Sequence, residues 1–305
     1  MNAEPVDADS TSLDARQAVD LARAHGIVLD PESIRFNEAG LDFQVAFADA
    51  VDGTEWVLRI PRRTDVADGI GAESRILGLV RQKISAAVPD WRVEARDLIA
   101  YPKLPGEPGL TLDDDGAPVW HFDRESEHHA RSLGRLIAEL HVIDLAEAQG
   151  AGIPTESPDQ VRAAWRSRLD RVAAEFAITP SLHEQWRGWL GDDALWPEYT
   201  VFTHGELYPM HLLLDADGGI RSVLDWTTAK VSDPALDFMY HAMMSSPAAL
   251  RTTLDAYAAA TGRVPPNLEA RCAALVAAGP LTYADYALTT GSEDHAAEAR
   301  RLLQP

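Results

Sequence analysis

The spacing of hydrophobic residues predicts a small sheet at the N-terminal end of the chain. Apolar residues recur at helical spacing over 13–22, before a glycine ends the run. Residues 41–47 then alternate apolar with polar side chains, and turn-forming residues at 51–54 separate them from a second strand at 55–60. These two strands predict an antiparallel hairpin.

A helix and a third strand complete this part of the chain. Apolar side chains share one side of a predicted helix near 70–87, and 93–100 is predicted as one further strand. We therefore expect residues 1–101 to form one lobe, a sheet with one helix packed on it, preceded by the N-terminal helix. A stretch rich in proline and glycine at 102–109 is the predicted linker.

The remaining residues, 110–305, predict a mostly helical lobe that one short hairpin interrupts. Helical spacing dominates from about residue 123 onward. Extended segments at 200–203 and 211–214 break this pattern, and a turn rich in aspartate and glycine leads into a returning strand at 220–224. The predicted fold class is α+β, with an N-terminal antiparallel sheet and a helical C-terminal lobe that carries the hairpin.

Composition narrows the class of protein and its partners. The 27 Lys and Arg residues against 48 Asp and Glu residues give a formal charge of -21, which argues against nucleic acid as the main partner. No apolar run approaches the roughly 20 residues of a membrane-spanning helix. The single cysteine, Cys272, fits a reducing compartment, and the acidic start of the chain lacks the features of a signal peptide. We expect a cytoplasmic protein that binds neither nucleic acid nor membranes.

The hairpin carries the strongest chemical signal, in the segments 203–211 and 224–226. Glu206 places a carboxylate on a loop, where it could accept a proton from a hydroxyl group. His211 follows five residues later, and the hairpin returns Asp225 close to His211. A carboxylate and a neutral nitrogen ligand can hold a divalent cation beside phosphate oxygens. The arrangement is typical of phosphoryl transfer.

These motifs resemble the aminoglycoside-phosphotransferase branch of the kinase-like superfamily, and the resemblance continues at 133–141 and 233–237. It implies a two-lobed kinase fold that binds a nucleotide in its cleft. The reaction implied is transfer of the γ-phosphoryl group of GTP, with ATP possible, to the 2'-hydroxyl of a macrolide. Within the branch, the segments most similar to macrolide 2'-phosphotransferases are 56–63, 88–91, 98–102 and 225–230.

The resemblance implies that Glu206 is the catalytic acid/base and that His211 and Asp225 bind Mg²⁺. Glu206 stands where the family usually has Asp, and the extra methylene moves the carboxylate by roughly 1.5 Å. A misplacement of that order can slow a positioned reaction roughly a hundredfold. A catalytically silent nucleotide-binding protein is therefore one alternative, and a solvated loop acid is the structural reading of Glu206 taken alone. His211 replaces the usual Asn of the kinase-like set, as it does in the macrolide branch.

The resemblance assigns the nucleotide donor to the N-terminal lobe. Arg59 would grip the phosphates in place of the usual lysine, because a guanidinium can bind phosphate bidentately. Glu73 would be its ion-pair partner on the following helix, although an ordinary surface ion pair is the alternative. Gly40, in the loop 37–42, would let the backbone approach the phosphates. The purine would meet the backbone of Ala100, Tyr101 and Pro102.

The residues after the hairpin are the predicted acceptor site. A macrolide is a large, mostly apolar ring with an amino sugar, whose dimethylammonium group lies next to the 2'-hydroxyl. We expect Met239, Tyr240 and Met243 to form an apolar wall and Asp237 to bind the cation, although core packing must account for about half of this apolar set. An aminoglycoside or other small-alcohol kinase is a second alternative, which would need many more carboxylates around an open cleft.

Other polar residues near the motif are predicted to be structural. His204 would brace the catalytic loop through hydrogen bonds. Asp233 would cap a helix that begins with Pro234. The pair His128 and His129 would lie on an exposed helix face.

Overall fold

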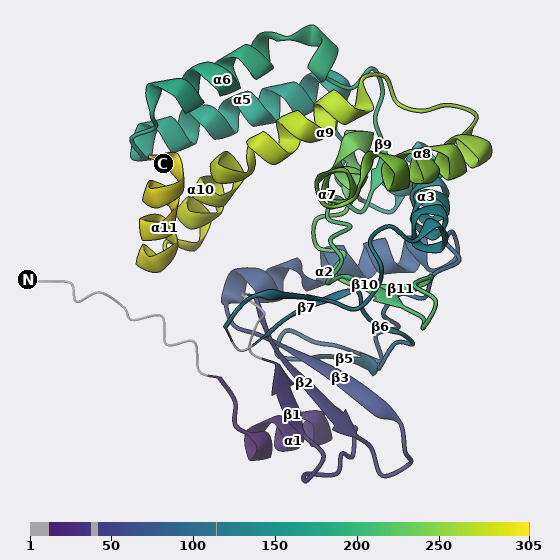
Figure 1. The fold of residues 1–305 in the computed structure, drawn as a ribbon. Coiled ribbons are helices and arrows are strands. Elements are labelled where there is room, and N and C mark those ends of the chain that lie inside the picture. Colours follow the sequence, from purple (N-terminus) through teal and green to yellow (C-terminus); the bar gives the residue numbers. More distant parts are fainter. Residues whose placement is uncertain (1–11, 38–41, 114, 305) are drawn as a thin grey trace, which may run out of the picture. The chain divides into compact units, whose positions relative to one another are not determined.

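The computed structural model describes residues 12–37, 42–113 and 115–304 and divides the chain into two compact units (Figure 1). The first unit ends at Pro105 and leaves out Gln82–Ala86, which belong to the second unit together with the residues from Gly106 onward. The change of unit thus falls inside the stretch 102–109. Gly40, proposed from the sequence to lie over the phosphates, is outside the described residues.

The first unit holds an antiparallel sheet of five strands in the order β1-β2-β3-β5-β4. The predicted hairpin is confirmed, since β2 pairs with β3 and Val45 lies opposite Arg59. The predicted strand at 93–100 is wrong: it is two strands, because the amide of Ala95 donates to the carbonyl of Leu98 (2.9 Å) and turns the chain. The elements are α1 (Ala15–Ala24), β1 (Arg35–Asn37), β2 (Phe43–Asp49), β3 (Glu55–Pro61), α2 (Thr64–Val80), β4 (Val93–Glu94) and β5 (Ile99–Pro102).

This sheet has a helix on each face, whereas the sequence predicted one. Ala46 and Leu58 pack with Ala18 of α1 on one face. Phe43 and Val57 pack with Ile70 of α2 on the other face. Because successive side chains of a strand point to opposite faces, β2 and β3 can serve both helices at once. The predicted helix at 70–87 also has wrong bounds, since α2 runs from Thr64 to Val80.

The second unit is mostly helical, as predicted, and the α+β class is confirmed. In Figure 1, α5 and α6 run side by side, and α10 and α11 pair near the C-terminus. None of the helices in the described part of the chain is long and apolar enough to cross a membrane. The helices are α3 (Glu127–His141), α4 (Leu145–Gly150), α5 (Pro158–Glu175), α6 (Pro180–Gly191), η1 (Asp193–Leu195), η2 (Pro234–Asp237), α7 (Met239–Met244), α8 (Pro247–Thr261), α9 (Leu268–Ala277), α10 (Gly279–Thr290) and α11 (Glu293–Leu303).

Short strands of the second unit hold the loop that carries the motif. The predicted hairpin is confirmed, because β10 pairs antiparallel with β11 and the Asp215 side chain accepts from the amide of Gly219 (2.8 Å) in the turn. β9 pairs instead with β12, a strand that the sequence did not predict. The loop from β9 to β10 is therefore fixed at both ends. The strands are β6 (Glu107–Pro108), β7 (Leu110–Leu112), β8 (Pro118–Trp120), β9 (Val201–Thr203), β10 (Leu212–Leu214), β11 (Ile220–Val223) and β12 (Lys230–Ser232).

Helices α3 and α8 approach each other closely at Gly134, so we expect Gly134→Ala to lower the free energy of unfolding by about 1–3 kcal/mol. A Cβ atom at this position would overlap the Thr253 carbonyl oxygen and lie 2.9 Å from the Ala256 Cβ. The matched control is Gly188→Ala in α6, where a Cβ atom meets nothing within 4 Å. It should instead raise stability by about 0.4–1 kcal/mol. Equal effects in denaturant unfolding would contradict close packing at Gly134.

Candidate active site

Asp237 anchors the loop between β9 and β10. One of its carboxylate oxygens accepts from the amide of His204 (3.1 Å), and the other accepts from the amide of Gly205 (2.7 Å). Asp237 is only 1% exposed. A carboxylate used in this way is not available to a substrate, so its placement does not fit the cation contact predicted for Asp237. It instead fixes the backbone directly before Glu206.

His141 supports Asp237 from α3, and the sequence analysis did not single it out as a site residue. Its Nε2 donates to the Asp237 carboxylate (3.1 Å), and its Nδ1 lies 3.1 Å from the hydroxyl of Tyr257. The detectable signal was a histidine on the apolar side of a predicted helix, four residues after the buried Ile137. A buried polar group in such a place requires hydrogen-bond partners.

His204 braces the loop, as predicted, and it does so as a neutral ring. Its Nδ1 accepts from the amide of Glu206 (3.2 Å), so the proton lies on Nε2, which donates to the carbonyl of Leu224 (3.0 Å). Burial lowers the pKa of His204 to about 4. The ring therefore ties the start of the loop to the end of β11, just before Asp225.

The structure brings His211 and Asp225 together, as expected from their places in the hairpin. The Nδ1 of His211 donates to the carbonyl of Glu206 (3.1 Å), which leaves the lone pair on Nε2. That Nε2 lies 3.8 Å from an Asp225 carboxylate oxygen. Asp225 adopts a left-handed backbone (φ 57°), and its other oxygen accepts from the hydroxyl of Thr227 (2.6 Å). Such strain in a residue other than glycine is typical of functional sites.

Glu206 is half-buried in the same loop. Burial raises the pKa of Glu206, the nearby His211 ring opposes this, and the charge of Asp225 adds to it. The three side chains therefore act on one another electrostatically. A carboxylate with a raised pKa is better matched to proton transfer than one that is fully solvated. The described residues contain no group of three or more His, Cys, Asp or Glu side chains arranged for a metal ion.

Asp233 has the structural role expected of it. Its carboxylate accepts from the amide of Ala235 (2.7 Å) and caps η2, whose first residue is Pro234. Asp233 also pairs with Arg271, and both side chains are almost completely buried. The cap holds η2 in place, so that Asp237 at its end reaches the loop.

In the first unit, Arg59 and Glu73 form an ion pair, with 2.8 Å between guanidinium nitrogen and carboxylate oxygen. The side chains are 10% and 2% exposed, which excludes an ordinary surface pair. The Arg59 guanidinium also lies 4.1 Å above the ring of Phe43. Glu73 and Phe43 thus restrict the orientation of the Arg59 guanidinium.

The predicted purine-binding segment is the strand β5. Ala100 and Tyr101 are buried within the sheet, and Pro102 is half-buried at the end of the strand. The carbonyl of Ala100 accepts from the amide of Arg92 (2.8 Å). Any contact of this backbone with a purine stays a prediction.

The predicted acceptor wall lies on α7. Met243 is exposed, and Met239 and Tyr240 are half-buried. The ring of Tyr240 lies edge to face with that of Tyr208, with centroids 5.1 Å apart and planes at 71°. Burial raises the pKa of Tyr240 to about 12, and the charges of Glu206 and of ionised Tyr208 add to this effect. Tyr208 was missed as a site residue, although it stands inside the motif.

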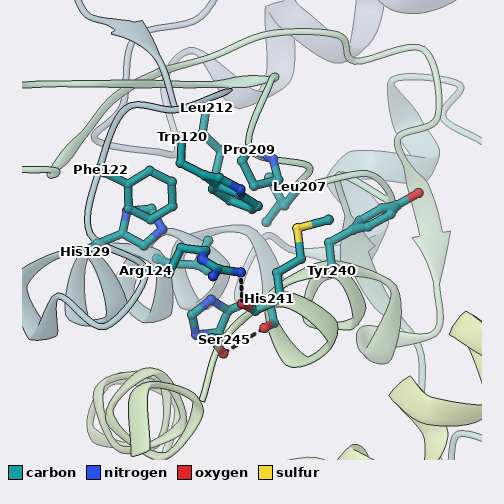
Figure 2. Close-up of a pocket in the computed structure, with 12 residues that line it drawn as sticks. Trp120, Phe122, Arg124, His129, Leu207, Pro209, Leu212, Tyr240, His241 and Ser245 are labelled. Carbon is teal, nitrogen blue, oxygen red and sulfur yellow. Dashed lines mark hydrogen bonds between the residues drawn. The ribbon is translucent and has the colours of Figure 1, made fainter. Parts of the chain in front are cut away.

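A small pocket lies beside this wall, and two histidines line it, the buried His129 and the half-buried His241 (Figure 2). Its volume is about 20 Å³, which suits roughly one water molecule. His129 is 3% exposed and stacks against Phe122, so its predicted exposed position is wrong. His241 bonds to the hydroxyl of Thr253 (2.8 Å). The lining residues are Trp120, Phe122, Arg124, His129, Leu133, Leu207, Pro209, Leu212, Tyr240, His241, Met244 and Ser245.

We expect Asp237→Asn to lower both stability and turnover. An amide offers one acceptor oxygen where the loop requires two, so the free energy of unfolding should fall by about 1–3 kcal/mol. The loosened backbone before Glu206 should lower kcat roughly a hundredfold. Asp255→Asn on the exposed side of α8 is the matched control and should change stability by less than about 0.5 kcal/mol. Unchanged kcat in a folded Asp237→Asn protein would argue against anchoring.

Stability should fall as pH falls from about 6.5 to about 4. Burial lowers the pKa of His204 and His241 to about 4, below the ordinary value of 6.5. Between these values the unfolded chain binds protons that the folded protein does not, so each ring contributes a slope of up to about 1.4 kcal/mol per pH unit. Denaturant unfolding across this range measures the slope. His241→Gln should remove the contribution of one ring to the slope of unfolding free energy against pH. An unchanged slope would count against a His241 that stays neutral in the folded protein.

Comparison with known proteins identifies relatives over nearly the whole chain. The macrolide 2'-phosphotransferase MphH from Brachybacterium faecium is 49% identical, with 96% of this chain and 98% of that chain covered and a TM-score of 0.88. A macrolide 2'-phosphotransferase of type I is 36% identical, with 97% and 98% covered and a TM-score of 0.89. The uncharacterized protein YcbJ of Bacillus subtilis (strain 168) is 37% identical over 282 residues, 92% of each chain.

The match to a family covers most of the chain as well. Residues 33–275 match the phosphotransferase enzyme family (APH). This range includes the sheet of the first unit and the whole motif around Glu206. The kinase-like fold inferred from the motifs is confirmed. The chain therefore belongs to the phosphotransferase enzyme family and is a phosphotransferase with an alcohol group as acceptor.

Proposed function

We propose that this enzyme transfers the γ-phosphoryl group of GTP to the 2'-hydroxyl of a macrolide antibiotic and thereby inactivates it. The close approach of His211 and Asp225 beside the loop that holds Glu206 carries the proposal, because it would join a base to a pair of cation ligands. The likeness to MphH supports a macrolide as acceptor. The methionines of α7 and the paired rings of Tyr208 and Tyr240 suit a large apolar ring better than a polycationic sugar.

Glu206 would act on the acceptor. Its carboxylate would orient the 2'-hydroxyl by accepting its hydrogen bond and would take the proton late in the transfer. Partial burial and the raised pKa both favour this role. The Asp237 anchor and the His204 brace would keep the carboxylate at a constant distance from the hydroxyl, since positioning supplies much of the rate in such reactions.

His211 and Asp225 would hold Mg²⁺. The Asp225 carboxylate is a ligand type that Mg²⁺ prefers, and the neutral His211 nitrogen would bind Mg²⁺ more weakly. The hydrogen bond from Nδ1 to the Glu206 carbonyl orients the ring and leaves Nε2 toward Asp225. Bound there, Mg²⁺ would neutralise charge on the phosphates of the donor. Two protein ligands suffice, because Mg²⁺ usually takes its remaining ligands from phosphates and water.

In the first unit, Arg59 would bind phosphate oxygens of the donor. Its pairing with Glu73 and its stacking on Phe43 restrict the guanidinium before any ligand arrives. We retain the backbone of Ala100, Tyr101 and Pro102 as the purine contact and Gly40 as part of the phosphate loop. A cytoplasmic location is also proposed, which the single, buried Cys272 supports.

A phosphorylation assay with GTP and ATP, against erythromycin-like and kanamycin-like acceptors, tests the proposal. The native chain should phosphorylate the macrolide with GTP, and Glu206→Ala should lower kcat by roughly 10²- to 10⁴-fold. Glu206→Asp withdraws the carboxylate by roughly one bond length and should lower kcat by up to roughly a hundredfold. Product with kanamycin alone would indicate an aminoglycoside kinase instead. Nucleotide binding without product in any form would indicate a catalytically silent protein.

A further inference from the structure

Asp237, the carboxylate predicted to hold the cation of the substrate, is not available to it. Both of its oxygens accept backbone amides of the loop, and its residue is 1% exposed. A macrolide nevertheless carries its dimethylammonium group next to the hydroxyl that receives the phosphoryl group. This cation must therefore lie close to Glu206 when the hydroxyl is in place, and other groups near Glu206 must receive it.

Two tyrosines from different elements meet beside Glu206. Tyr208 follows it by two residues in the loop, and Tyr240 comes from α7. Their rings pack edge to face at 5.1 Å, so each ring keeps at least one face that the other does not cover. Tyr208 also lies edge to face with the ring of His211, with centroids 6.3 Å apart. Tyr208 belongs to the same loop as Glu206, and the ring contact places Tyr240 beside that loop. Burial raises the pKa of both hydroxyl groups, and the charge of Glu206 adds to this. Figure 2 shows Tyr240 projecting away from the small pocket, with its hydroxyl at the far end.

We propose that the faces of Tyr208 and Tyr240, together with the carboxylate of Glu206, bind the dimethylammonium group of the acceptor. The attraction is of the cation–π type, in which the negative ring face meets the positive charge. Aromatic faces suit alkylated ammonium groups, and methyl groups can contact the rings directly. The inference rests on the proposed function and adds two specificity-determining residues to it.

The hydroxyl groups are not needed for this role. Neither hydroxyl has a hydrogen-bond partner within the described ranges, so Tyr208→Phe and Tyr240→Phe remove no bond seen in the structure. These variants should keep KM for the macrolide within about twofold of native. Tyr208→Leu and Tyr240→Leu remove the ring and should each raise KM roughly 2- to 30-fold. The Leu variants should raise KM by a larger factor than they lower kcat, because the ring would contact the cation and not the transferred group.

A matched pair of acceptors separates charge recognition from shape. The first acceptor is the macrolide with its dimethylammonium group. In the second acceptor a formyl group replaces one N-methyl group, which makes the nitrogen neutral at nearly the same size. The Leu variants should raise KM for the amine and leave KM for the neutral analogue within about twofold. Replacement of Tyr240 by phenylalanines with increasing fluorine content keeps the ring shape and weakens its face. The KM for the amine should then rise with each fluorine, which a purely structural role of the ring would not produce.

The outcomes distinguish this inference from the function on which it rests. Suppose that the native enzyme phosphorylates macrolides and that the Leu variants raise KM equally for both acceptors. That result would overturn the cation site and leave the proposed function intact. A flat response to fluorination would also overturn it. Failure of the native chain to phosphorylate any macrolide would remove the proposed function, and with it the inference.

Discussion

The carboxylate of Asp237 holds the loop between β9 and β10 in shape, and the position of Glu206 depends on that shape. It accepts two successive backbone amides, from His204 and Gly205, in a place that solvent hardly reaches. Hydrogen bonds to an ionised group are stronger than neutral ones, and they strengthen further where water is absent. The backbone before Glu206 is thus fixed by a group that takes no part in the chemistry.

Three histidines also help to fix this loop, and each uses one ring nitrogen in a hydrogen bond to a defined partner. His141 donates to Asp237, His204 accepts from the Glu206 amide, and His211 donates to the Glu206 carbonyl. Each commitment decides what the other nitrogen can do. His204 consequently reaches across to Leu224, whereas His211 presents a lone pair toward Asp225. The same residue type thereby serves as a brace in one position and as a candidate ligand in the next.

The use of Asp237 as an anchor changes how acceptor recognition has to be explained. A buried carboxylate bonded to its own chain offers no attraction to an incoming cation. Under the proposed function, acceptor specificity would then depend on partly exposed side chains, namely Tyr208, Tyr240 and the methionines of α7. These are apolar surfaces with polarisable faces, which fit a bulky ring with a single cation. The acceptor wall and the anchor share one short stretch of chain, so their positions are linked.

Local patterns in the sequence determined the class of fold, the two hairpins and the residues of the motif. Alternation and turn residues depend on neighbours in the chain. Glu206, His211 and Asp225 could therefore be proposed from the hairpin and from the resemblance of its motif to known phosphotransferases. Contacts between distant segments decided the rest. The second helix on the sheet, the pairing of β9 with β12, the burial of His129 and the inward turn of Asp237 each depend on residues far away in the sequence. The sequence shows an aspartate but not whether its carboxylate faces a substrate or a backbone amide. Only the packing around the side chain decides between the two.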